Sequence, residues 1–86
     1  IAVSGVRSMA DESLIARGDV TIRDLNRQFD WHLPDDRAAT VAGLVMHEAR
    51  RIPEAGQHFD FYGFRFEILR RARNQITSIR ITPPPG

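Results

Sequence analysis

The sequence predicts a single small α+β domain in which two helices pack on one face of a sheet. The expected element order is one strand, two helices and then three antiparallel strands. Three observations support this prediction. The chain has 86 residues, which suits one hydrophobic core. Two amphipathic segments each follow a threonine, and apolar residues alternate with polar ones in the last third of the chain.

The two ends of the chain carry no periodic pattern. Residues 1–11 are predicted to be a linker or the tail of a preceding module, residues 12–82 the folded domain, and residues 83–86 a proline-rich tail. Because the chain begins with Ile1 and ends in three prolines and a glycine, we expect a fragment of a longer protein.

The first helix is predicted to begin after Thr21, whose hydroxyl can accept a hydrogen bond from a first-turn amide. Asp24 lies at the capping-box position. The helix cannot continue past Leu33, because Pro34 disfavours helical geometry in the residue before it. The face expected to pack on the core carries Ile22, Leu25 and Phe29.

The second helix is predicted to begin after Thr40 and to end near Arg51. Gly43 weakens this helix by about 1 kcal/mol relative to alanine, so we expect a strand backbone to pass close to it. The residues expected on the buried face are Val41, Leu44, Val45, Ala49 and Ile52.

The strands are predicted from period-two alternation and from turn residues. A short strand at residues 13–17 is closed by Gly18. Three antiparallel strands follow the second helix, with Gly63 in the first hairpin turn and Arg73-Asn74 in the second, where asparagine tolerates the left-handed region. The side chains expected to face the core are Phe59, Phe61, Phe64, Phe66, Ile68, Thr77, Ile79 and Ile81.

Composition excludes several classes of function. The chain has no cysteine, so it has no disulfide and no thiolate chemistry. No apolar run approaches the roughly 20 residues that a membrane-spanning helix needs. Lysine is absent, but the 12 arginines are spread among 11 acids and the net charge is only +1, which argues against a nucleic-acid-binding surface. Residues 49–86 form the more basic half, with seven arginines and three acids.

A metal site is not predicted. His32, Asp35 and Asp36 lie close together and could hold a hard cation, but a solvated loop explains them better. His47 and His58 are isolated from other ligand types, so neither has the spacing of a transition-metal ligand.

An enzyme is not predicted either. The serines at positions 4, 8, 13 and 78 lie outside any nucleophile motif, and no spacing suggests a nucleophile, a base and an orienting acid together. The acid pair Asp35-Asp36 is expected in an exposed loop, where acid–base catalysis has no cleft.

Nucleic-acid binding is an alternative, because Tyr62 to Glu67 has the aromatic alternation of an RNA-recognition strand. The match fails at Tyr62 and Arg65, where a basic and a small residue are expected, and Glu67 would repel phosphate. We therefore expect Phe64 and Phe66 to belong to the core.

Several short motifs occur in an order and spacing that are specific only together. They are Asp11-Glu12-Ser13-Leu14-Ile15-Ala16-Arg17-Gly18, Thr21-Ile22-Arg23-Asp24-Leu25-Asn26, Leu33-Pro34, Thr40-Val41-Ala42-Gly43-Leu44-Val45, Arg51-Ile52-Pro53-Glu54-Ala55-Gly56, Phe64-Arg65-Phe66-Glu67-Ile68 and Ile79-Arg80-Ile81. In these motifs the chain resembles the CorC/HlyC transporter-associated domain, which follows a pair of CBS domains in certain bacterial membrane proteins. Glu12 stands where that family usually has glycine.

The resemblance implies a cytosolic regulatory or accessory domain of a hemolysin-like membrane protein linked to magnesium and cobalt efflux. It implies a location at the cytoplasmic face of the bacterial inner membrane. The implied partners are the CBS pair and the membrane domain of the same polypeptide, or a second copy in a homodimer; no nucleic acid is expected.

The family's fold is grouped with a flavin-binding (FAD-binding) domain, so binding of a flavin or an adenine nucleotide is an alternative function. No glycine-rich phosphate loop supports it. Regulation through protein contacts is the preferred hypothesis.

The residues predicted to make these contacts are arginines of the basic half and the single tryptophan, because arginine and tryptophan are enriched at interface hot spots. For Trp31, partial burial against the core is the competing interpretation. The predicted interface residues are Trp31, Arg50, Arg51, Arg70, Arg71 and Arg73.

Overall fold

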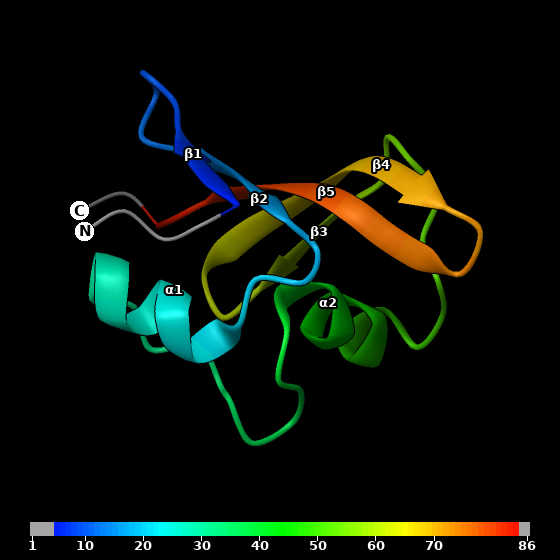
Figure 1. The fold of residues 1–86 in the computed structure, drawn as a ribbon, viewed down its shortest axis with the longest axis horizontal. Helices are drawn as coiled ribbons and strands as arrows, with labels where there is room; N and C mark the ends of the chain where they lie inside the picture. The colour runs from blue at the N-terminus through cyan, green and yellow to red at the C-terminus, as the bar shows by residue number, and fades with distance from the viewer. Residues whose placement is uncertain (1–4, 85–86) are drawn as a thin grey trace.

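The computed structural model describes residues 5–84 and contains five strands and two helices (Figure 1). In chain order the elements are β1 (Val6–Ser8), β2 (Leu14–Arg17), α1 (Ile22–Phe29), α2 (Val41–Ala49), β3 (His58–Phe61), β4 (Phe64–Ala72) and β5 (Gln75–Thr82). Neither helix is long and apolar enough to cross a membrane within these residues.

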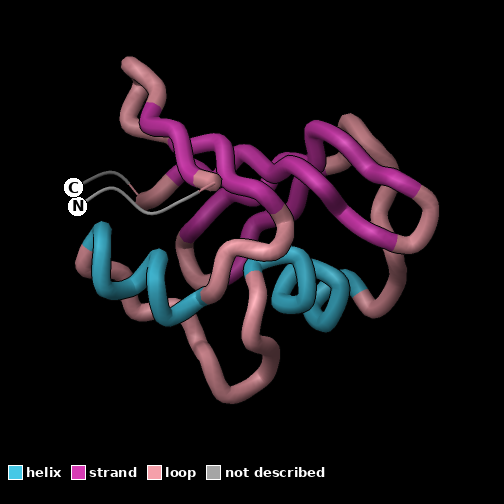
Figure 2. Tube along the Cα trace, viewed as in Figure 1, coloured by secondary structure: helices cyan, strands magenta, loops and turns pink. Residues whose placement is uncertain are grey.

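The strands form one antiparallel sheet in the order β1-β2-β5-β4-β3. Both helices lie on the same side of this sheet (Figure 2), as the sequence predicted. The sheet has one more strand than predicted, because β1 pairs with β2 at Val6 opposite Ala16. Residues 6–8, predicted to belong to a linker or to the tail of a preceding module, therefore form an edge strand; residues 1–4 lie outside the described range. A three-residue edge strand is too short to show a period in the sequence.

The threonine caps of both helices are confirmed. The Thr21 hydroxyl accepts a hydrogen bond from the Asp24 amide at 3.2 Å, and the Thr40 hydroxyl accepts one from the Gly43 amide at 3.1 Å. Each helix ends at a residue in the left-handed region, Asp30 with φ +58° and Arg50 with φ +59°. The second helix is therefore slightly shorter than predicted.

The expected strand beside Gly43 is not there. A Cβ at Gly43 would meet the Thr40 hydroxyl at 3.1 Å and the Ala38 side chain at 3.3 Å. The close backbone approach occurs at Gly18, where a Cβ would lie 1.8 Å from the Ile76 carbonyl oxygen. A side chain at position 18 would therefore push β5 away from the end of β2.

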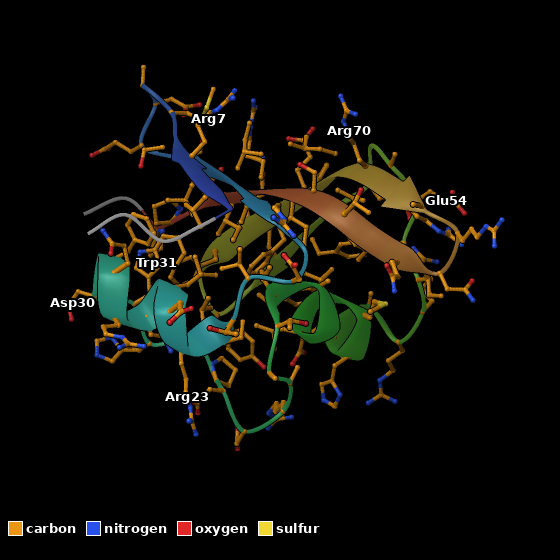
Figure 3. All side chains as sticks on the ribbon, in the orientation of Figure 1. Arg7, Arg23, Asp30, Trp31, Glu54 and Arg70 are labelled. Atoms are coloured by element: carbon orange, nitrogen blue, oxygen red, sulfur yellow. The ribbon has the colours of Figure 1, made fainter. Side chains whose placement is uncertain are left out.

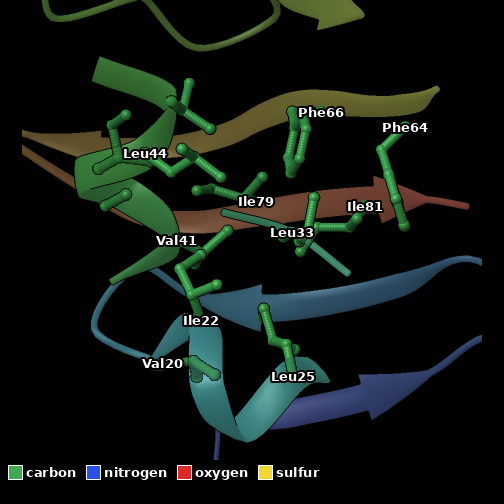
Figure 4. Packing of buried hydrophobic residues seen from close by; sticks show 14 of the residues in the cluster. Val20, Ile22, Leu25, Leu33, Val41, Leu44, Phe64, Phe66, Ile79 and Ile81 are labelled. Carbon is green, nitrogen blue, oxygen red and sulfur yellow. The ribbon is translucent and has the colours of Figure 1, made fainter. Parts of the chain in front are cut away.

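The core lies between the helices and the covered face of the sheet (Figure 4). Phe66, Ile68, Ile79 and Ile81 from β4 and β5 are completely buried, as are Ile22, Leu25, Val41, Leu44 and Val45 from the helices. Of the predicted helix face, Phe29, Ala49 and Ile52 are only partly buried. The apolar pattern thus predicted the position of the core correctly. It overestimated the burial of residues at the ends of α1 and α2.

The alternation in β5 changes phase, which the sequence pattern did not reveal. Ile79 lies opposite Ile68, Ser78 opposite Arg70 and Ile76 opposite Arg71, with register shifts between these pairs. As a result Ile76 is buried and Thr77 is exposed, so the prediction that Thr77 faces the core is wrong. An irregularity of one residue moves every following side chain to the other face.

The turns lie where the sequence predicted them, but the residues in the left-handed region differ in part from those expected. Tyr62 and Gly63, with φ +57° and +83°, form the two-residue β3–β4 turn. In the β4–β5 turn the left-handed residue is Arg73, with φ +56°, and Asn74 is not in that region. In the β1–β2 loop Glu12 has φ +71°, so this glutamate adopts a conformation that glycine adopts more easily.

The proline-rich tail follows β5. Pro83 is partly buried and Pro84 is exposed, whereas residues 85–86 lie outside the described range.

Candidate functional site

At one end of the sheet, the segment after α2 and the residues in and beside the β4–β5 turn carry four of the predicted interface arginines. Arg50 and Arg51 follow α2, Arg73 lies in the β4–β5 turn, and Arg71 joins the two segments. Its Nη1 donates to the Glu54 carboxylate at 2.6 Å and to the Ile52 carbonyl at 3.4 Å. Its Nε donates to the Arg73 carbonyl at 2.7 Å. We call residues 50–54 and 70–73 the arginine end.

Only Arg71 among these arginines is tied into the fold. Its side chain is 24% exposed, whereas Arg50, Arg51, Arg70 and Arg73 are exposed residues. Arg70 lies opposite Ser78 and projects from the side of the sheet that the helices leave open (Figure 3). The predicted arginines therefore form no single patch, since Arg71 is bonded to the segment after α2 and Arg70 projects from the open side of the sheet.

Trp31 lies at the other end of the molecule, just after α1 (Figure 3). Its ring centroid is 5.2 Å from that of Phe29 and 4.8 Å from that of Phe64, the second pair being edge-on. The indole is partly buried and packs against the core. Partial burial, the competing interpretation in the sequence, therefore describes Trp31, and its role in an interface stays a prediction.

Trp31 also lines a hollow of about 510 Å³. Apolar lining comes from Leu14, Phe29 and Pro84, and polar lining from the β1–β2 loop, with Asp11 and Glu12. We call this the Trp31 hollow. Sequence reasoning missed the two acids; the only signal was the unusual Glu12 at a glycine position.

Asp11 is held as an anion at this hollow. Its carboxylate accepts hydrogen bonds from the Ser13 hydroxyl at 2.5 Å and the Ser13 amide at 3.1 Å. These two bonds, together with a smaller effect of the Arg80 charge, lower the pKa of Asp11 below its ordinary value of 3.8. Ser13 itself is 1% exposed, so its hydroxyl serves the loop and is closed to a substrate.

Of the acids and histidines weighed as metal ligands, Asp35 is already paired with an arginine. Arg23 donates to the Asp35 carboxylate at 3.3 Å. Within residues 5–84 no group of three or more histidine, cysteine, aspartate or glutamate side chains could hold a metal ion.

A second hollow, of about 390 Å³, lies between the end of β2, α2 and the start of β5. Its charged lining consists of Arg17 and Asp19, which pair with each other at 2.7 Å. Thr40 and Met46 from the second helical segment complete one wall. A flavin or nucleotide phosphate would have to compete with Asp19 for the arginine.

The aromatic strand is not arranged for stacking on bases. Phe64 and Phe66 are 7% and 0% exposed and belong to the core. Arg65 donates to the Asp60 carboxylate at 3.1 Å on the other side of the sheet. The core interpretation of these residues is confirmed.

Comparison with known proteins identifies the family. A family model described as the transporter associated domain (CorC_HlyC) matches residues 7–85. The chain belongs to this family. The resemblance seen in the sequence motifs is thereby confirmed.

Relatives with curated descriptions are larger proteins. The chain is 34% identical over 73 residues to the UPF0053 inner membrane protein YfjD of Escherichia coli, which covers 85% of this chain and 17% of that protein. It is 24% identical over 80 residues to the magnesium and cobalt efflux protein CorC of Pasteurella multocida, covering 93% of this chain and 27% of that protein. The chain thus spans less than a third of these relatives.

Solved structures share the fold. A conserved protein of unknown function from Haemophilus influenzae superposes with a TM-score of 0.87 at 30% identity, covering 93% of this chain and 99% of that one. The transporter associated domain of a CBS domain protein from Porphyromonas gingivalis superposes with a TM-score of 0.82 at 23% identity, covering 94% and 99%. Domains of this size and fold therefore exist as separate structures.

Proposed function

We propose that this chain is a regulatory or accessory domain of a CBS-domain membrane protein linked to magnesium and cobalt efflux. In this proposal it works at the cytoplasmic face of the inner membrane through contacts with the CBS pair and membrane portion of the same polypeptide. The observation that carries the proposal is the match to the transporter associated domain over residues 7–85, together with CorC relatives of which the chain spans about a quarter.

The surface of the domain supports action through contacts. At the arginine end Arg50, Arg51 and Arg73 are exposed, and the ion pairs found within residues 5–84 involve none of them. At the opposite end the Trp31 hollow offers an aromatic surface. Arginine and tryptophan side chains of this kind are the common anchors of protein interfaces.

The test uses the full-length protein in bacteria that lack their own cobalt exporter. One form carries the domain and the other lacks the part that corresponds to residues 5–84. Cell cobalt is measured by mass spectrometry at rising external cobalt, with protein levels in the membrane matched. We expect cells with the truncated form to retain more cobalt than cells with the complete form. Equal cobalt content at equal protein level would contradict the proposed role.

Binding of a small molecule is the alternative, and the hollow beside Arg17 is where it would occur, since its volume lies within the range of ligand pockets. Thermal unfolding of the chain with FAD, FMN, ATP, AMP, magnesium or cobalt tests it, because a ligand of the folded state raises the melting temperature. A saturable rise that Arg17→Ala removes would support a sensor domain.

A further inference from the structure

We propose that the Trp31 hollow is a docking site for a basic segment of another protein surface, with an arginine or lysine side chain lying on the indole and pairing with Glu12. The inference rests on the proposed function, in which the domain acts through protein contacts. It adds the surface used and the chemistry of the partner.

The hollow provides a rigid aromatic surface. Phe29 and Phe64 both pack against the Trp31 ring, with centroid separations of 5.2 and 4.8 Å and interplanar angles of 31° and 66°. Leu14 and Pro84 add apolar lining around it. An indole face is the best of the aromatic surfaces for a cation, and a rigid one loses little entropy when it is covered.

The rim of the hollow supplies negative charge. Glu12 is exposed and takes part in none of the ion pairs found within residues 5–84. Asp11 is already engaged by Ser13 and is influenced by Arg80, so Glu12 is the carboxylate that is free to pair. Asp30, next to Trp31, adds a third acid at the same end of the molecule (Figure 3).

This chemistry selects one class of occupant. Anionic lipid would be repelled by the acids. A second copy could offer its arginine end, but the two surfaces lie on different parts of the molecule. Such a head-to-tail contact leaves one free surface at each end and does not close into a dimer by itself. The occupant is therefore a basic segment of a protein surface other than a second copy of this domain.

The test uses the fluorescence of Trp31, which is the chain's one tryptophan. The probe is the peptide acetyl-Gly-Arg-Arg-Gly-amide. Its controls are the same peptide with citrulline, an uncharged isostere of arginine, and with glutamate. We expect a saturable change in Trp31 emission with the arginine peptide, weakened by added salt, and none with the controls.

Two matched variants assign the site. Glu12→Gln keeps the shape and removes the charge, so the dissociation constant should rise about two- to fivefold, as for an exposed ion pair. Asp36→Asn removes an acid from the exposed loop between the helices and should leave the dissociation constant unchanged.

Three results of the peptide titration would overturn the proposal: no saturable change with the arginine peptide, an equal response to the citrulline peptide, or equal weakening by both variants. Association of the chain with itself, measured by sedimentation and lost in Glu12→Gln, would also overturn it, because the occupant would then be a second copy. None of these outcomes affects the cobalt measurement, so the proposed function can stand or fall separately.

Discussion

The two ends of the sheet hold their predicted interface side chains in opposite ways. At the Trp31 hollow, the predicted interface residue also packs on Phe29 and Phe64. At the arginine end, only Arg71 takes part in the fold, and Arg50, Arg51 and Arg73 are exposed. We therefore expect stability and binding to be coupled at the hollow and separable at the arginine end.

The largest effect should come from breaking this coupling at the hollow. Trp31→Ala removes an aromatic ring that is partly buried, so we expect a loss of about 2–3 kcal/mol, below the cost of a fully buried tryptophan. The melting temperature should then fall by roughly 10–20 °C. Tyr62→Ala, at the 48% exposed tyrosine, is the control and should cost less than about 1 kcal/mol. An unchanged melting temperature in Trp31→Ala would mean that the two ends do not differ.

The separability of the arginine end can be tested with neighbouring residues. Arg71→Ala loses the bonds to Glu54, Ile52 and Arg73, and we expect a loss of about 1 kcal/mol, kept small because Glu54 is 75% exposed. Arg70→Ala should change the free energy of unfolding by less than about 0.5 kcal/mol. Urea denaturation of the two variants measures the difference, and equal losses would show that Arg71 has no special structural role.

Glu12→Gly should separate stability from binding at the hollow itself. Glycine adopts the observed φ of +71° without the strain of a side chain, so we expect a gain of about 0.5 kcal/mol after its larger chain entropy is counted. Binding of the arginine peptide should weaken in the same variant. Destabilisation on urea denaturation would show that the glutamate side chain supports the loop.

The smallest effect concerns the acid dependence of the same loop. Because the folded-state pKa of Asp11 lies below its ordinary value of 3.8, its ionised form stabilises the fold above that pH, and the contribution disappears as pH falls through the folded-state pKa. Ser13→Ala removes the main donor. The variant should therefore lose less stability than the parent between about pH 5 and about pH 2, as followed by urea midpoints. A steeper loss in the variant would contradict the assignment.

Local sequence signals predicted most of the fold because they act over a few residues. Thr21 and Thr40 cap their helices through amides three positions away, and Tyr62-Gly63 turns the β3–β4 hairpin. The incorrect predictions concern positions whose environment is set by a segment far away in the sequence. The close approach lies at Gly18, against the Ile76 carbonyl, and not at Gly43. Ile76 is buried and Thr77 is exposed, because the pairing of β5 with β4 is irregular.

In the candidate site, too, local features could be predicted from the sequence and contacts between distant segments could not. Arginine and tryptophan could be chosen from the sequence by residue type, but their surroundings could not. The tie between Arg71 and Glu54 spans 17 positions, and the Trp31 hollow joins the β1–β2 loop, the end of α1 and the chain after β5. No periodic pattern connects such segments.

By itself, the sequence determined the α+β class, the capped helices, the apolar face of the sheet and the transporter-associated family, because these depend on periodicity, capping and short motifs. Only the tertiary structure decided that β1 joins the sheet, that Arg71 reaches Ile52 and Glu54, and that Glu12 and Trp31 line the same hollow. The physical reason is that these relations arise from strand register and from contacts between segments far apart in the chain, which local sequence does not specify.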